Sequence, residues 1–167
     1  MSWDKGIDYE SAYSKILKHM LKARYPGLCY DAILLIQLRN GSRVSEAVRS
    51  FREFLTIKAI EVSVRVSKRK DNAQRLMVIP RELLNTNIDM CKELLSLNDA
   101  KLVNRVKTYV KEAYGFNTHS LRYAFITHLL KSGVNPAVVS KITGHKNINY
   151  VLAYTQEKVG VEVLRNL

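Results

Sequence analysis

The sequence has few of the residues on which small extracellular domains and flexible chains depend. Its 167 residues include 2 Cys, 7 Gly and 3 Pro. Cys29 and Cys91 are too few for a disulfide framework and lack the paired spacing of a zinc site, so they predict a protein of a reducing compartment. The scarcity of Gly and Pro, beside 47% hydrophobic residues, excludes disordered and collagen-like chains. We therefore expect one folded domain over residues 1–167.

Long apolar runs and acidic residues are also scarce. No apolar run approaches the roughly 20 residues of a membrane span, and the first residues lack the basic and then apolar layout of a signal peptide. These absences predict a cytoplasmic protein with no membrane partner. The 15 acidic residues are outnumbered by 27 Lys and Arg, which gives a net charge of +12. This excess favours a polyanionic partner, and nucleic acid is the first candidate.

Helical spacing of apolar residues and helix-capping residues predict helices over most of the chain. The first predicted helix runs from Ala12 to Leu21 and ends before Pro26. Asp31 and Ser42 are expected to cap the second and third helices, and the expected caps of the last three helices are Thr118, Asn135 and Asn147. After Pro80 the pattern is helical to the end, with segments at 83–97, 102–110, 118–130, 136–142 and 147–154.

Between residues 54 and 80 the hydrophobic period changes from helical to alternating, which predicts a β-hairpin. The alternating residues of one face are Val62, Val64 and Val66. The turn falls at 70–72, residues 75–80 form the second strand, and Leu55 with Ile57 supplies a third. The expected fold class is α+β, mainly α-helical, with helices around a small three-stranded antiparallel sheet.

A set of polar residues at helix starts and turns suggests chemistry on a phosphodiester. Each is unremarkable alone, but the spacing of three places His119 and Arg122 on one helical face, and His145 follows Gly144 at a helix end. They are expected to converge on one anion. The full set is Arg43, Lys70, His119, Arg122, His145 and Tyr154.

The residue types in this set suit nucleophilic attack on phosphorus. Two guanidiniums, from Arg43 and Arg122, can hold the non-bridging oxygens of a phosphodiester and stabilise the charge of a pentacoordinate transition state. A Tyr hydroxyl, with an ordinary pKa near 10, needs help to attack, which His119 or His145 can supply. A Lys on a hairpin can protonate the leaving 5′ oxygen.

The C-terminal part of this set resembles the catalytic domain of the tyrosine recombinase (phage integrase) family. The family pattern is His-x-x-Arg, then Gly-His about two dozen residues on, then Tyr about nine residues later. Residues 119–122, Gly144 with His145, and Tyr154 hold all of these spacings.

The resemblance extends upstream and covers residues 9–157. Arg43 and Glu46 resemble the family's first arginine box, in which the acidic residue supports the arginine. In the hairpin, the family has a Lys, then an Arg five residues later, then a strand ending in Pro; Lys70, Arg75 and Pro80 follow this order, and Lys68 competes with Lys70.

The resemblance implies the tyrosine recombinase catalytic-domain fold and metal-free strand transfer on double-stranded DNA. Tyr154 would form a 3′-phosphotyrosine and release a 5′ hydroxyl. The resemblance implies no cofactor, which agrees with the lack of a Gly-rich phosphate-binding loop in the sequence. It also implies a tetramer on DNA, with residues 159–167 exchanged between protomers. The family's N-terminal DNA-clamping domain has no room in 167 residues.

The basic hairpin residues are expected to contact DNA phosphates without reading sequence. They are Arg65, Lys68, Arg69 and Arg75. Two other functions fit part of the pattern. A type IB topoisomerase shares the clamp and the Tyr, and a non-catalytic helix-turn-helix module would explain residues 136–154 and the charge, but not Arg43 or the His119 and Arg122 pair.

Overall fold

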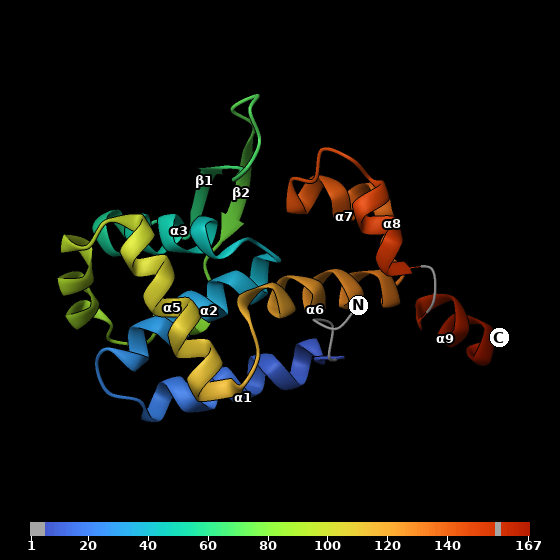
Figure 1. Ribbon diagram of the computed structural model, residues 1–167. Helices are drawn as coiled ribbons and strands as arrows, with labels where there is room; N and C mark the ends of the chain where they lie inside the picture. The colour runs from blue at the N-terminus through green and yellow to red at the C-terminus, as the bar shows by residue number, and fades with distance from the viewer. Residues whose placement is uncertain (1–5, 156–157) are drawn as a thin grey trace.

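The computed structural model describes residues 6–155 and 158–167, with the side chains at 154, 155, 158 and 159 left aside. Helices surround one long buried helix, and a two-stranded hairpin stands out from one side (Figure 1). Within the described ranges, no helix is both long enough and apolar enough to cross a membrane.

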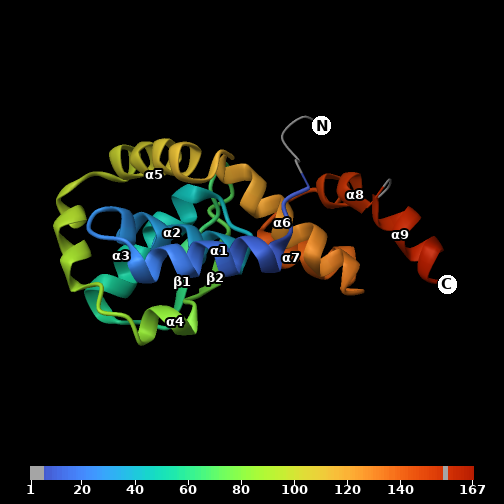
Figure 2. The ribbon, with the colours of Figure 1, turned by 90° about the horizontal axis from the view of Figure 1, so that it is seen from below.

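The central helix is α2 (Gly27–Asn40), and α1 (Tyr9–Lys22) packs along it (Figure 2). Nearly every α2 side chain is buried. The prediction that Asp31 caps the second helix is wrong, because Asp31 lies inside α2 with no exposed surface. Its carboxylate accepts hydrogen bonds from Tyr109 and Tyr114 and contacts His19 Nδ1 at 2.7 Å. A buried carboxylate needs such partners, and they replace the capping role.

Helix α3 (Val44–Ile57) is longer than the sequence pattern predicts and absorbs the expected third strand. Phe51, Phe54 and Leu55 are buried on its inner face, so the helical period continues past residue 51. The helix ends at Lys58, whose φ of 54° is left-handed. Ser42 is also not its cap: Arg43 holds the N-cap position. The prediction of a third strand is therefore wrong.

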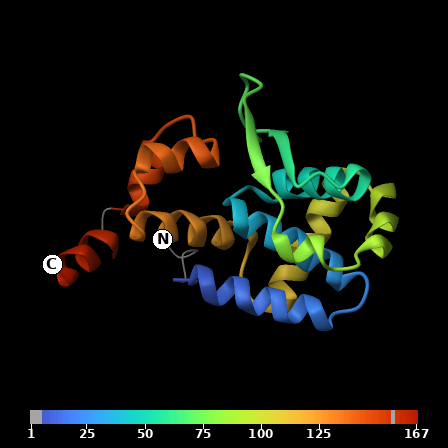
Figure 3. The same cartoon turned by 180° about the vertical axis from the view of Figure 1, so that it is seen from behind.

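The hairpin has two antiparallel strands, β1 (Glu61–Arg65) and β2 (Gln74–Val78), in a register that pairs Val62 with Met77 and Val64 with Arg75. The valines expected on one face are all buried. The structure thus confirms the α+β class with a smaller sheet. The hairpin tip and α7 rise on the same side of the molecule (Figures 1 and 3).

The segment after the hairpin differs from the predicted continuous helix over 83–97. It holds a short turn of helix, α4 (Arg81–Leu84), and a 3-10 helix, η1 (Asp89–Ser96), before α5 (Asp99–Tyr114). A disulfide joins Cys91 in η1 to Cys29 in α2. The expectation that these cysteines form no disulfide is wrong, because η1 folds back over residues 62 positions earlier.

The C-terminal helices are α6 (Thr118–Lys131), α7 (Pro136–Thr143), α8 (Asn149–Thr155) and α9 (Lys158–Asn166). Asn117, one residue before the predicted Thr118, caps α6, and Asn135 caps α7 as expected. A second apolar cluster joins these helices: Phe125, Ile126, Leu130, Val139 and Val151. It packs α7 and α8 against the middle and the C-terminal end of α6.

Candidate active site

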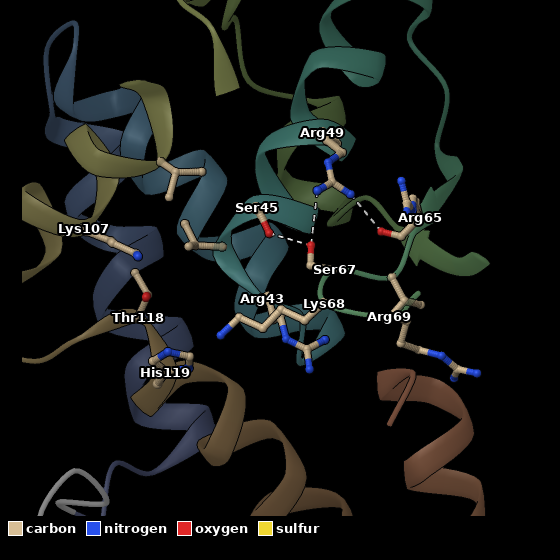
Figure 4. A pocket seen from close by; sticks show the side chains of 13 residues that line it. Arg43, Ser45, Arg49, Arg65, Ser67, Lys68, Arg69, Lys107, Thr118 and His119 are labelled. Carbon is tan, nitrogen blue, oxygen red and sulfur yellow. Dashed lines mark hydrogen bonds between the residues drawn. The ribbon is translucent and has the colours of Figure 1, made fainter. Parts of the chain in front are cut away.

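Four separate segments meet at one cavity of about 370 Å³: the start of α3, the hairpin loop, α5 and the start of α6 (Figure 4). Six of the labelled side chains there are cationic: Arg43, Arg49, Arg65, Lys68, Arg69 and Lys107 (Figure 4). The predicted residue His119 also lines it. The fold therefore brings together residues that lie as much as 76 positions apart, from 43 to 119.

Arg122 follows His119 by three residues on α6 and is 4% exposed. Its Nη1 donates to the carbonyl of Gly41 at 2.9 Å, and its Nη2 donates to the carbonyl of Thr143 at 3.4 Å. Burial, and after it the charge of the nearby Arg43, lower the pKa of Arg122 to about 9. A guanidinium whose charge is this poorly solvated favours an anionic ligand.

His145 meets Arg122 from the turn that follows α7. Gly144 makes this turn with a φ of 76°, and a side chain there would come within 2.9 Å of Val66. Thr143 Oγ1 already donates to the Val139 carbonyl, so it accepts the proton of His145 Nδ1 at 2.6 Å. The other ring nitrogen, Nε2, then accepts from Arg122 Nη2 at 3.0 Å.

This arrangement fixes both the tautomer and the charge of His145. Burial and the neighbouring Arg122 lower the pKa of His145 to about 3, so the ring is neutral at pH 7. Because its free nitrogen already accepts from Arg122, His145 orients that guanidinium. His145 is consequently a poor candidate for proton acceptance.

Glu46 connects the start of α3 to the hairpin and has no exposed surface. Its carboxylate accepts from the backbone N–H of Arg43 at 3.1 Å and from Arg43 Nη1 at 3.4 Å. It also accepts from the Ser67 N–H at 2.9 Å and from Arg75 Nη1 at 3.5 Å. These contacts match the supporting position that the resemblance implies for Glu46.

The guanidinium of Arg75 is engaged inside the protein. Arg75 is 5% exposed, and its guanidinium donates to Glu46 and to the carbonyls of Asn40 and Thr143. The expected contact of Arg75 with a DNA phosphate stays a prediction. The place of Arg75 in β2 turns its side chain inward, where it joins the hairpin to the end of α2 and the end of α7.

His119 stands at the rim of the cavity, at the start of α6. Partial desolvation lowers its pKa, and the cations Lys68 and Lys107 lower it further. The ring is therefore neutral at pH 7 and can accept a proton. The His-x-x-Arg spacing predicts that the two side chains share one helical face; in the structure His119 is exposed and Arg122 is buried.

The hairpin loop is held to α3 at Ser67. Its hydroxyl lies 2.7 Å from Ser45 Oγ and 3.2 Å from Arg49 Nη2, while Glu46 accepts its N–H (Figure 4). Lys68 follows with a φ of 66° and lines the cavity with Arg43 and His119. Lys70 is exposed two residues farther along and is not among the residues that line this cavity.

Tyr154 belongs to α8, but its side chain lies outside the described residues. The helix packs on α6 and α7 through the buried Val151. Tyr154 is thus on an element fixed to the helix that carries His119 and Arg122. Tyr150, in the same helix, is 66% exposed and stacks near His145 with ring centroids 6.3 Å apart.

Some residues of the cavity are not predicted by any sequence motif. Ser67 and Arg49 fix the lysine loop, and Lys107 adds a cation from α5. Arg49 follows Arg43 by six residues on α3, so its helical spacing does not place it beside the arginine box. These roles emerge from packing between segments.

Comparison with known proteins supports the same assignment. The Phage integrase family model matches residues 9–160. A putative integrase, ORF241, of Acidianus two-tailed virus is 38% identical over 99% of this chain and 69% of its own. The tyrosine recombinase XerA of Thermococcus kodakarensis is 29% identical over 78% of this chain and 42% of its own.

Solved structures share the fold. The XerH site-specific recombinase in a post-cleavage complex with a palindromic difH substrate superposes with a TM-score of 0.63 at 19% identity, over 96% of this chain. This chain spans about half of the XerH chain, 52%. The family match, the shared fold and the convergence of Arg43, His119, Arg122 and His145 lead to one conclusion: this chain belongs to the phage integrase family of tyrosine recombinases.

Proposed function

We propose that this domain cleaves and rejoins double-stranded DNA through a covalent 3′-phosphotyrosine intermediate. The observation that carries the proposal is an excess of buried positive charge. Arg43 is close enough to lower the pKa of both Arg75 and Arg122, and within the described residues the carboxylate bonded to this cluster is Glu46. Three guanidiniums against one carboxylate leave a site that an anion would complete.

The scissile phosphate would be that anion. Arg43, whose side chain is 21% exposed and lines the cavity, and Arg122, which is buried in α6, would bind the non-bridging oxygens. Charge grows on these oxygens in the pentacoordinate transition state, so guanidiniums fixed in advance stabilise it more than the ground state. Arg122 is fixed by Gly41, Thr143 and His145.

Tyr154 would supply the attacking oxygen. Its O–H bond breaks as the oxygen bonds to phosphorus, and the neutral His119 would accept the proton. The phosphorus–5′ oxygen bond breaks in the same step and leaves a 3′-phosphotyrosine. Attack by a 5′ hydroxyl reverses the step and releases Tyr154.

Lys68 would protonate the leaving 5′ oxygen. It lines the cavity beside Arg43 and His119, and Ser67 holds its backbone to α3. Lys70, which the motif order favours, remains the alternative donor. The geometry of the loop supports Lys68 over Lys70.

Arg65 and Arg69 would contact flanking phosphates. Arg65 is exposed on β1, whereas Arg69 reaches from the hairpin to the carbonyl of Gly144 at 3.3 Å. A second groove, lined by Arg69, Lys141, His145 and Lys146, extends this basic surface along α7. We further propose that the protein assembles as a tetramer on DNA, as the resemblance implies, and that it acts in the cytoplasm, as the sequence predicts.

The other candidate functions explain less of the structure. A helix-turn-helix module needs α7 and α8, but it gives no reason for the buried cations beneath α3 and α6. A type IB topoisomerase would use the same clamp but would relax supercoils without exchanging strands. Relaxation of supercoiled plasmid without exchange between two marked duplexes would favour that second function.

Covalent capture tests the proposal. The probe is a pool of nicked duplexes with randomised 30-base-pair cores, so that cleavage releases a short fragment and traps the adduct. We expect a protein–DNA adduct that survives denaturant and is lost after protease treatment. Sequencing the trapped strands then gives one duplex for quantitative work. Absence of any adduct from the whole pool would contradict the proposal.

A further inference from the structure

Gln37 interrupts the apolar α2 close to its C-terminal end and is 1% exposed. Its amide nitrogen donates two hydrogen bonds, one to the carbonyl of Ser42 at 3.2 Å and one to the carbonyl of Thr118 at 3.0 Å. These acceptors lie in different segments of the chain. Ser42 directly precedes Arg43, and Thr118 directly precedes His119.

Gln37 thus bridges Ser42 and Thr118, and it makes two hydrogen bonds to Ser42. Its side chain donates to the Ser42 carbonyl, and its backbone carbonyl accepts from the Ser42 N–H at 3.1 Å. Ser42 has no exposed surface, and Thr118 is 3% exposed. Both contacts are therefore shielded from water. Loss of such a buried hydrogen bond is costly, because water does not replace the missing partner.

The bridge links two groups that the reaction would use at the same moment. Arg43 would bind the phosphate, and His119 would accept the proton of the nucleophile. They sit on α3 and α6, whose N-terminal ends both face the cavity. Because one side chain on the central helix α2 binds both segments, it fixes the N-terminal ends of α3 and α6 relative to each other.

We propose that Gln37 is a positioning residue that sets the distance between Arg43 and His119 for the cleavage step. This inference rests on the proposed function. An amide is required because the position needs two N–H donors from one nitrogen. Met would keep the volume but offer neither donor, and displacement of a reacting group by about 1 Å can slow a reaction by about 100-fold.

The test compares Gln37→Met with Tyr114→Phe in the full chain, on the nicked duplex recovered from the randomised pool. Tyr114 donates to the buried Asp31 at 2.6 Å, so its variant also removes a hydrogen bond to α2, but one that does not involve Ser42 or Thr118. Both variants should lose thermal stability and keep DNA affinity within about twofold. Single-turnover cleavage should fall by about 10- to 100-fold in Gln37→Met alone.

A substrate with a bridging 5′ sulfur separates this role from proton donation. Sulfur leaves without protonation, so that substrate should not restore cleavage by Gln37→Met, because Arg43 and His119 act on other atoms. Equal cleavage rates in Gln37→Met and Tyr114→Phe would overturn the inference, as would a defect confined to affinity.

If Gln37→Met does not fold, Gln37→Glu tests the same role. A buried carboxyl regains one O–H donor when it is protonated. The ratio of variant to wild-type cleavage should therefore rise as pH falls from about 8 to 6. A flat ratio would overturn the inference. If the wild-type protein forms no adduct, the proposed function fails and this inference fails with it, whereas a wild-type adduct with unaffected Gln37 variants overturns this inference alone.

Discussion

Arg122 donates a 2.9 Å hydrogen bond to the carbonyl of Gly41, two residues before Arg43. The two guanidiniums proposed to bind phosphate are thus joined through one turn of backbone. Gly41 is suited to this turn, since its φ is 57° and a side chain there would lie 2.0 Å from the Phe125 ring. The relative placement of Arg43 and Arg122 is a property of the folded chain before DNA binds.

The clamp predicts that lysine cannot replace either arginine. Arg43→Lys and Arg122→Lys remove the planar fork while keeping a positive charge. Loss of one donor to a transition-state oxyanion costs about 100- to 1,000-fold in other enzymes, so single-turnover cleavage should fall by about that factor. Affinity for the duplex, measured by fluorescence anisotropy, should change far less.

Arg65→Lys is the matched control for the clamp. Arg65 is an exposed cation on β1 at the edge of the same cavity. Its replacement should leave cleavage near the wild-type rate, because a phosphate contact needs charge more than a fork. If Arg43→Lys and Arg122→Lys behave like this control, or lose affinity alone, these arginines position DNA and do not act in catalysis.

The donor of the leaving-group proton is predicted to be Lys68. Lys68→Ala should slow cleavage of ordinary DNA, and a bridging 5′ sulfur at the scissile phosphate should largely restore it, because a thiolate leaves unprotonated. Lys70→Ala should cleave both substrates alike. Restoration of Lys70→Ala in place of Lys68→Ala would transfer the role to Lys70, and restoration of neither would exclude both lysines.

Ser67 is predicted to act through Lys68. Ser67→Ala removes the hydroxyl that meets Ser45 and Arg49, while the backbone contact to Glu46 remains. A less constrained loop should slow cleavage by about tenfold, and the 5′-sulfur substrate should recover most of that loss. Ser63→Ala, on the exposed side of β1, is the control and should match wild type. A Ser67→Ala defect that persists with the sulfur substrate would rule out this link.

Helix positions and the pairing of His119 with Arg122 could be predicted because they depend on local spacing. The 3.6-residue period and the cap residues Asn135 and Asn147 are read within one turn of chain. The predicted strand at Leu55 is wrong because a short apolar run is typical of both a strand and a buried helix end. The length of the element distinguishes the two, and α3 continues to Ile57.

What the sequence does not predict concerns contacts between distant segments. On an uninterrupted strand, Lys68 and Lys70 point the same way, but β1 ends at Arg65 and Lys68 adopts a positive φ. The burial of Arg75 depends on carbonyls at Asn40 and Thr143, which lie 35 and 68 residues away. Gln37 did leave a signal, a lone amide in an apolar stretch, but its partners are visible only in the fold.

The disulfide predicts a large contribution to stability with little effect on chemistry. Cys29 and Cys91 are separated by 62 residues, and closing a loop of that length reduces the entropy of the unfolded chain enough to stabilise the fold by about 4 kcal/mol. The double variant Cys29→Ala, Cys91→Ala should show that loss in urea unfolding. Dithiothreitol should destabilise wild type but not the variant, and a wild-type protein indifferent to reductant would contradict the pairing.

The identity of the residue joined to DNA tests the account most directly. The adduct trapped on the nicked duplex is digested with protease and nuclease, and tandem mass spectrometry locates the modified tyrosine. Tyr150 is the informative rival, because it is exposed in the same helix and stacks near His145. We predict a 3′-phosphonucleotide on Tyr154, no adduct from Tyr154→Phe at unchanged DNA affinity, and a normal adduct from Tyr150→Phe. An adduct on Tyr150, or one that persists in Tyr154→Phe, would contradict the account.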